Sequence, residues 1–315
     1  MIDAFAHFYP SVFLERLFQL DVTLPVFVQR APSHCDLDFR ITELDRNAVE
    51  RQVICLGTPA FDDLFPAEAS AAASELARIG NDGIAEIAAR YPQRFTAVAT
   101  LPLVGIPSLD AALDELERTI ALGFKGVQLY TRVGNVGVDD PAFAVLWERI
   151  AAHNLPVLLH PTGGSDNPLA RDYLLWLTFG WPLETSLMML RLVYGGLYER
   201  FPSLKILTHH LGAFVPVTAE RIKGVNFTLE RSTGTARPEP LLTSLKRFYG
   251  DTTVNGFPPA LNAGYEFFGA DHVLFATDYP YVPMTPQCQA VRAWNLAAAD
   301  KEKILDTNAR QFFGF

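Results

Sequence analysis

The stretch Lys205–Pro216, K-I-L-T-H-H-L-G-A-F-V-P, decides the fold predicted for this chain. A short apolar run, Ile206 and Leu207, leads into two adjacent histidines, His209 and His210, and then into a glycine. This pattern is typical of a buried strand that delivers polar residues to a tight turn. The two histidines are therefore predicted to lie at the carboxyl end of a strand.

Three other short runs end in a residue that can bind a metal or move a proton. Residues 1–7 (M-I-D-A-F-A-H) end in His7, residues 156–160 (P-V-L-L-H) in His160, and residues 272–278 (H-V-L-F-A-T-D) in Asp278. These runs lie far apart in the sequence. A parallel barrel is the simplest way to bring them together, because all its strands point their carboxyl ends at one face.

Strand-like and helix-like segments alternate along the whole chain, which predicts an α/β fold. We expect strands at residues 1–7, 52–56, 95–101, 124–130, 156–160, 204–209, 247–251 and 273–278. We expect helices at residues 41–51, 67–91, 109–122, 141–153, 174–200 with a break near 180–182, 216–224, 258–268, 287–297 and 301–312. Eight repeats favour a closed (β/α)8 TIM barrel. Residues 11–42 are interpreted as an extended loop insertion after the first strand, and residues 1–315 as a single domain.

Composition excludes several classes of protein. The 315 residues are 49% hydrophobic and 19% charged, so a large core is expected and global disorder is not. The net charge is -9, and no long Lys/Arg run suggests nucleic-acid binding. Neither a signal peptide nor a membrane span is expected. The widely spaced Cys35, Cys55 and Cys288 indicate reduced thiols, which favours the cytoplasm.

One helical segment predicts self-association. Residues 183–198 carry apolar side chains on nearly every face. The outer helix of a barrel should keep a polar face unless another surface covers it. We therefore expect a homodimer or a larger homo-oligomer.

The residues at the strand ends indicate chemistry as well as fold. Imidazole and carboxylate groups on separate strands suit zinc, iron or manganese, with coordination positions left for water and substrate. A metal or catalytic cluster is therefore expected at the carboxyl face of the barrel.

Seven stretches spread over nearly the whole chain carry a family resemblance. They are I-D-A-F-A-H-F-Y-P at 2–10, R-I-T-E-L-D at 40–45, F-T-A-V-A-T-L-P at 95–102, L-H-P at 159–161, G-W-P-L-E-T-S at 180–186, G-G-L-Y-E-R-F-P-S-L-K-I-L-T-H-H-L-G-A-F-V-P-V-T-A-E-R-I at 195–222 and T-D-Y-P-Y at 277–281. On these stretches the chain resembles the amidohydrolase superfamily, and within it the nonoxidative decarboxylases that include aminocarboxymuconate-semialdehyde decarboxylase. The resemblance implies a metal-dependent carboxy-lyase that acts on a small aromatic or enoic carboxylic acid.

The resemblance also implies a ligand set. The first strand of the family carries H-x-H or E-x-H, and both side chains of that motif bind the metal. Here the motif reads Phe5-Ala6-His7, so the second ligand is kept and the first is replaced by phenylalanine. His160 matches the family's metal histidine on strand five, and Asp278 matches the strand-eight aspartate, a metal ligand and proton carrier. The implied metal is zinc, with manganese or iron as alternatives.

The same resemblance implies a catalytic histidine. His210 matches it by the H-x-G-x-x-x-P spacing to Gly212 and Pro216, so His210 and Asp278 are the expected catalytic pair. His209 lies one residue before the position that matches the motif, and successive side chains on a strand point to opposite faces. We therefore expect His209 to point away from the site, into the core or outside the barrel.

Relatives bind their acidic substrate partly through an arginine on the long first loop, which here contains Arg30 and Arg40. Arg132 and Arg171, after the fourth and fifth strands, are further candidates, because a guanidinium clamps a carboxylate with two hydrogen bonds. The alternative for Arg40 is a salt bridge at the start of a helix. Phe5 makes the pocket more apolar, which suits binding of an aromatic or enoic ring.

Phe5 leaves three interpretations open. The site can be a metal site with one ligand fewer, or a metal-free acid–base pair of His210 and Asp278. Alternatively the chain has lost catalysis and serves as the partner subunit of an intact homologue. A hydrolase that opens a lactone or an amide with a metal-activated water is the alternative reaction.

Overall fold

A ring of parallel strands, bridged at one seam by backbone hydrogen bonds, organises the molecule. The computed structural model describes residues 1–20, 22, 31–57, 59–105, 108–162 and 170–315. The ring strands, in chain order, are β1 (Ile2–His7), β2 (Arg51–Cys55), β3 (Phe95–Ala97), β4 (Ala99–Thr100), β5 (Val127–Tyr130), β8 (Val157–His160), β9 (Ile206–Thr208), β10 (Tyr249–Asp251) and β11 (Val273–Leu274). Because β3 and β4 are two parts of one strand position interrupted at Val98, these nine segments fill eight positions.

The strand ladders are all parallel around the ring. One sheet has the order β1-β2-β3, and the other has the order β11-β10-β9-β8-β5-β4. No ladder joins β11 to β1 within the described residues, but backbone hydrogen bonds bridge this seam. Ala4 N donates to Phe275 O at 2.8 Å, and Asp278 N donates to Phe5 O at 3.1 Å. The first and last strand segments therefore lie side by side.

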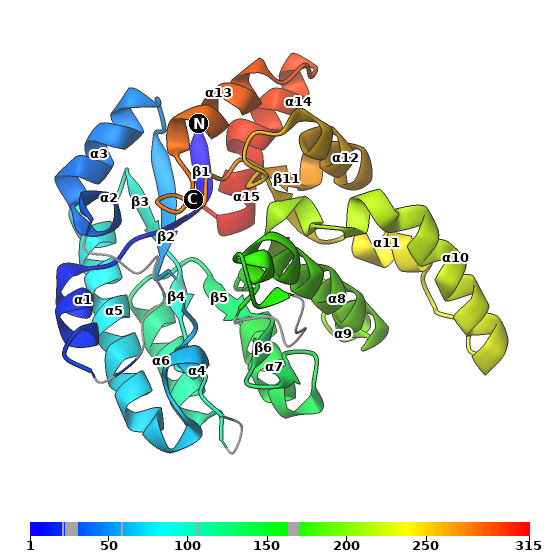
Figure 1. The fold of residues 1–315 in the computed structure, drawn as a ribbon, viewed down its shortest axis with the longest axis horizontal. Helices are drawn as coiled ribbons and strands as arrows, with labels where there is room; N and C mark the ends of the chain where they lie inside the picture. The colour runs from blue at the N-terminus through cyan, green and yellow to red at the C-terminus, as the bar shows by residue number, and fades with distance from the viewer. Residues whose placement is uncertain (21, 23–30, 58, 106–107, 163–169) are drawn as a thin grey trace.

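Helices cover the outside of the ring (Figure 1). They are α1 (Ser11–Leu17), α2 (Pro32–Cys35), α3 (Leu37–Arg46), α4 (Phe61–Leu64), α5 (Ser70–Arg90), α6 (Asp110–Ala121), α7 (Ala144–Ala152), α8 (Trp181–Tyr194), α9 (Leu197–Arg200), α10 (Val215–Thr233), α11 (Leu241–Leu245), α12 (Pro258–Phe268), α13 (Met284–Ala293), α14 (Ala298–Glu302) and α15 (Asn308–Phe313). A small hairpin of β6 (Arg132–Val133) and β7 (Val136–Gly137) follows β5. The alternation expected for a TIM barrel is thus confirmed.

Two expected segments differ from the structure. Residues 11–42 are not simply irregular, because α1, α2 and the start of α3 lie there; residues 21 and 23–30 are outside the described part. Helix α3 begins at Leu37, since the Asp36 side chain accepts a hydrogen bond from Phe39 N at 2.9 Å and caps it. Helix α10 continues past the expected end at residue 224 and stops only before Gly234, which has a left-handed backbone.

The apolar side chains form two cores. One fills the inside of the ring and includes Phe5, Val53, Leu158, Leu207 and Leu274. The other lies between the strands and the surrounding helices. Parallel strands that are buried on both faces have continuous apolar sequences, which explains the short apolar segments of this chain. In the part of the chain that is described, no helix combines the length and the apolar character needed to cross a bilayer.

Candidate functional site

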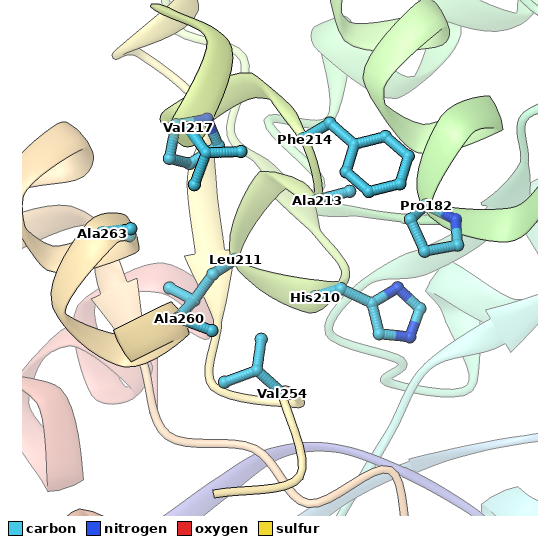
Figure 2. A pocket seen from close by; sticks show the side chains of 11 residues that line it. Pro182, His210, Leu211, Ala213, Phe214, Val217, Val254, Ala260 and Ala263 are labelled. Atoms are coloured by element: carbon cyan, nitrogen blue, oxygen red, sulfur yellow. The ribbon is translucent and has the colours of Figure 1, made fainter. Parts of the chain in front are cut away.

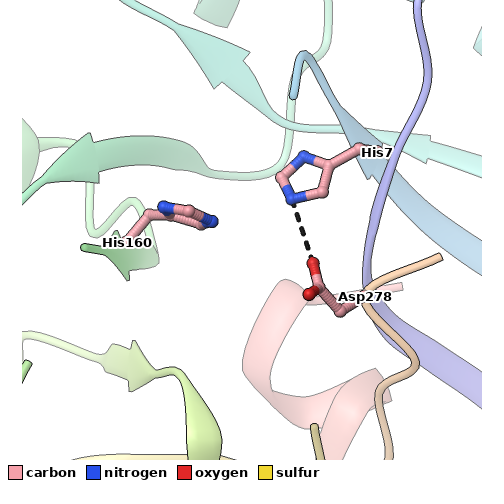
Figure 3. A group of neighbouring side chains, drawn as sticks. All are labelled: His7, His160 and Asp278. Atoms are coloured by element: carbon pink, nitrogen blue, oxygen red, sulfur yellow. Dashed lines mark ion pairs between the residues drawn. The ribbon is translucent and has the colours of Figure 1, made fainter. Parts of the chain in front are cut away.

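Three side chains from separate strands converge at the carboxyl face of the ring (Figure 3). His7 ends β1, His160 ends β8, and Asp278 follows β11. Their ligand atoms all lie within 4.8 Å of one another. His7 Nε2 and Asp278 Oδ1 are 3.2 Å apart, and both histidines are buried. The structure thus brings together the three residues expected to bind a metal.

The hydrogen bonds of the two histidines fix which nitrogen faces the site. His7 Nδ1 lies 3.0 Å from the carbonyl oxygen of Leu56, and His160 Nδ1 contacts the carbonyl oxygen of Pro161. A carbonyl can only accept, so both Nδ1 atoms carry a proton, and the neutral form of each ring keeps its lone pair at Nε2. Burial, and then the neighbouring His209 and His7, hold the pKa of His160 well below its usual range, which keeps it neutral.

This arrangement fits a divalent cation. His7 Nε2 and Asp278 Oδ1 are buried, and neither has a hydrogen-bond partner among the described residues. These two atoms lie 3.2 Å apart, and their lone pairs repel each other unless a proton on Nε2 or a bound cation lies between them. Two imidazoles and a carboxylate, with further positions open, form a known ligand set for divalent metals.

Phe5 lies at the floor of this site, on the inner face that it shares with His7. Its ring centroid is 4.6 Å from that of His7 and 3.9 Å from that of His209, and the side chain is fully buried. A phenyl ring offers no ligand atom, so the two-residue motif of the first strand supplies only His7. Substrate contact by Phe5 stays a prediction.

The expectation that His209 points away from the site is wrong. Its ring centroid lies 4.8 Å from that of His160, and its Nδ1 is 2.5 Å from Asp251 Oδ2. Its Nε2 is buried and has no described hydrogen-bond partner. The physical reason is the register of β9: Leu207 belongs to the core inside the ring, so His209, two residues on, points inward as well.

His209 and Asp251 form a buried acid–base pair. Burial alone would raise the pKa of Asp251, but the charge of His209 and its hydrogen bond lower that pKa below the usual range. The ionised carboxylate holds the proton on Nδ1 of His209, and Nε2 is left buried without a described hydrogen-bond partner. A histidine oriented in this way can take up and return a proton.

His210 lies next to His209, in a turn with an unusual backbone. His210, Leu211, Gly212 and Ala213 all have φ between 51° and 71°. Asp251 Oδ1 stabilises this turn by accepting a hydrogen bond from His210 N at 3.0 Å. The ring of His210 borders a cavity of about 170 Å³ (Figure 2). Burial, and then His209, lower the pKa of His210. Its catalytic role stays a prediction.

Aromatic side chains that were not singled out from the sequence surround the ligand cluster. The ring centroid of Tyr281 is 5.2 Å from that of His7, and those of Tyr130 and Trp181 are 5.4 and 5.5 Å from that of His160. Burial raises the pKa of Tyr130 well above its usual range, so its phenol stays a hydrogen-bond donor. The sequence feature that could have pointed to Tyr281 is its position three residues after Asp278.

Because Gly57 has no side chain, there is room beside it for the hydroxyl groups of Tyr9 and Tyr281. Tyr281 and Tyr9 contact each other through their hydroxyl groups. A Cβ atom at Gly57 would lie 2.4 Å from both hydroxyl oxygens. Any larger residue would therefore displace this pair of phenols.

The candidate arginines have different surroundings. The expectation that Arg40 clamps the substrate is wrong, because its side chain is fully buried and donates to His7 O, Ser33 O and Gln52 Oε1. These partners are neutral, so the alternative of a salt bridge at the helix start is wrong as well. Arg132 is partly buried, with Nε 3.0 Å from Glu184 Oε1, and Arg171 is exposed. Arg30 lies outside the described residues.

Comparison with known proteins gives a consistent result. Residues 2–315 match the family model described as Amidohydrolase. Gamma-resorcylate decarboxylase of a Rhizobium species is 31% identical over 293 residues, which cover 88% of this chain and 86% of that protein. The 2-amino-3-carboxymuconate-6-semialdehyde decarboxylase of Dictyostelium discoideum is 29% identical, covering 91% and 79%. The structure of a dihydroxybenzoic acid decarboxylase from Polaromonas, with bound manganese and 2-nitroresorcinol, aligns with a TM-score of 0.81 at 27% identity, covering 99% and 96%.

Proposed function

Because the chain belongs to the amidohydrolase family, we propose that it is a metal-dependent nonoxidative decarboxylase of a small aromatic carboxylic acid. The observation that carries this proposal is the convergence of His7 Nε2, His160 and Asp278 beneath a wall of aromatic rings. The relatives named above are decarboxylases, which supports the same reaction class.

His7, His160 and Asp278 would hold the ion. Manganese is the first ion to test, because the Polaromonas structure contains it, and zinc, favoured by the sequence, is the second. A bound divalent ion supplies Lewis-acid polarisation of the substrate oxygens. Tyr130 and Trp181 would pack on the substrate ring and exclude water.

The reaction also needs a proton at a defined place. Loss of carbon dioxide replaces a carbon–carbon bond by a carbon–hydrogen bond, so one proton must reach the ring carbon. His209 can hold and release that proton at Nε2, because Asp251 fixes its Nδ1. Asp278 is the second candidate carrier, and His210 is the alternative to His209. Arg132 and Arg171 remain candidates for binding the carboxylate.

The test is carbon dioxide release from a panel of hydroxybenzoates labelled at the carboxyl carbon, with 2,6-dihydroxybenzoate included. We expect release by manganese-loaded protein, loss after chelation, and recovery when manganese returns. Unchanged turnover in the stripped protein would remove the metal from the mechanism. Ring opening of a lactone, offered as a separate substrate, without release of carbon dioxide would favour the hydrolase. A folded, metal-loaded protein inactive toward all these compounds would favour a partner-subunit role.

We also propose that the chain works as a homodimer. Helices α8 and α10 border an open groove of about 420 Å³ that is mostly apolar. The large apolar side chains exposed on these two helices are Leu183, Leu187, Tyr194, Val217, Val225, Phe227 and Leu229. A second copy of the same surface would cover both helices. We further propose that residues 1–315 form a single catalytic domain. We propose the cytoplasm as its location, where Cys55 and Cys288 stay as buried thiols.

A further inference from the structure

A chain of buried polar groups runs behind the metal-ligand cluster. Arg40 Nη1 donates to Gln52 Oε1 at 2.8 Å, and Gln52 Nε2 donates to Asp3 Oδ2 at 2.7 Å. Asp3 Oδ2 also accepts from Thr277 Oγ1 at 2.6 Å, and Asp3 Oδ1 accepts from Thr277 N at 3.0 Å. All four side chains are fully buried. The network therefore links α3, β2, β1 and the segment after β11.

Both ends of this network touch the backbone of a metal ligand. At one end, Arg40 Nη2 donates to the carbonyl oxygen of His7 at 2.8 Å. At the other end, Thr277 directly precedes Asp278. These two ligands lie on opposite sides of the seam, where backbone hydrogen bonds replace a strand ladder.

We propose that Arg40 is a positioning residue that sets the separation of His7 and Asp278 across the seam, and so the affinity of the metal site. The proposal rests on the metal site of the proposed function. The guanidinium of Arg40 contacts neither ligand side chain. It packs 4.5 Å from the ring centroid of Tyr279 and 5.2 Å from that of Phe8. A small slip of β1 against β11 changes the distance between the two ligand atoms directly, and metal coordination tolerates only a few tenths of an ångström.

The identity of the residue matters as much as its charge. A planar guanidinium can serve His7 O, Ser33 O and Gln52 Oε1 at once, whereas a lysine ammonium lacks that fork. Removing a group that orients a metal ligand typically weakens metal binding about 10–100-fold. We expect that range for Arg40→Met, with a smaller effect for Arg40→Lys.

The experiment measures manganese affinity directly, by competition with a chelator and by the electron paramagnetic resonance signal of free manganese. Asn81→Ala is the matched control, because Asn81 is fully buried and bonds Thr100 N, Thr100 O and Glu115, none of them next to a ligand. Both variants should lower the melting temperature of the metal-free protein. Only Arg40→Met should raise the dissociation constant for manganese.

Wild-type manganese affinity in Arg40→Met, or an equal loss in Asn81→Ala, would overturn the proposal. If Arg40→Met does not fold, Gln52→Met is the second variant, because it interrupts the same network between Arg40 and Asp3. Gln52→Met is also expected to weaken manganese binding. Unweakened binding in that variant would overturn the proposal as well. Tight binding of manganese without carbon dioxide release counts only against the proposed reaction. A wild-type protein that binds no divalent ion would overturn the positioning role itself.

Discussion

At the scale of single residues, Phe5 is predicted to stand where the family carries a first metal ligand, two residues before His7. Phe5→His should bind zinc and manganese more tightly than wild type, because it adds an imidazole on the face that already carries His7. Losing the buried ring should cost about 1–3 kcal/mol of stability. Phe5→Leu is the control, since it stays apolar and adds no ligand. Equal or weaker binding in folded Phe5→His would mean that the pocket has been rebuilt around the phenyl ring.

The two adjacent histidines can be separated by a matched pair of substitutions. His209→Gln should lower kcat about 10²–10⁴-fold, the range for loss of a general acid–base group, because its ring lies 4.8 Å from that of His160 and its Nε2 is buried without a described partner. His210→Gln should change kcat much less, because no carboxylate among the described residues pairs with that ring as Asp251 pairs with His209. Steady-state kinetics with manganese-loaded proteins of equal metal content measure both. The opposite order would restore His210 as the catalytic histidine.

Asp3 makes stability depend on pH. Burial raises its pKa from 3.8 to about 6, so the folded protein holds this proton more tightly than the unfolded chain does. The stability that the proton contributes is complete below pH 3.8 and is lost as the pH rises through about 6; it amounts to about 3 kcal/mol. Urea unfolding of metal-free protein at pH 4 to 7 should show this decline, and Asp3→Asn should flatten it. An unchanged slope in the variant would contradict the assignment.

At the scale of elements, the turn after β9 and the end of β10 work as one unit. Asp251 Oδ1 accepts from the turn backbone while Oδ2 holds His209. Asp251→Asn can keep the first bond but places an amide N–H against Nδ1, which would move the histidine proton to Nε2. We expect near-wild-type stability with kcat reduced at least 100-fold. Nuclear magnetic resonance of the imidazole nitrogens would report the tautomer, and an unchanged tautomer with full activity would contradict this account.

The sequence predicted the order of these elements better than the direction of their side chains. Both Ile206 and Leu207 are apolar, because β9 is buried on both faces, so hydropathy could not tell which one faces inward and, with it, whether His209 does. The same limit applies to Arg40. Its position in α3 was visible, but burial of a guanidinium depends on Gln52 and Asp3 from other strands, which no local pattern reveals.

At the scale of the whole molecule, the α8–α10 surface predicts the oligomeric state. Leu187→Glu should convert the dimer to a monomer in light scattering at micromolar concentration, because it places a charge on the apolar face. Leu122→Glu is the control, since Leu122 is 49% exposed and Leu187 is 50% exposed, but Leu122 lies beyond α6. A wild-type monomer, or a Leu187→Glu dimer, would contradict this prediction.

The barrel itself was predictable because alternating strands and helices allow few topologies. The convergence of His7, His160 and Asp278 followed from the same rule, since His7 and His160 end ring strands and Asp278 follows one; their role as metal ligands stays a prediction. The aromatic wall around them was not predicted: Tyr130 ends the expected strand 124–130 and Trp181 lies in the stretch 180–186, but no local pattern shows that both rings meet at His160.

The seam between the first and last strand segments has a consequence for biosynthesis. Asp3 and Thr277 bond to each other although 274 positions separate them. During translation the N-terminal strand therefore leaves the ribosome long before its final neighbour exists. Ribosome-bound chains stalled before Asp278 emerges should fail to retain manganese, while those stalled well beyond it should retain the ion. Metal capture would then report that synthesis has passed the last strand.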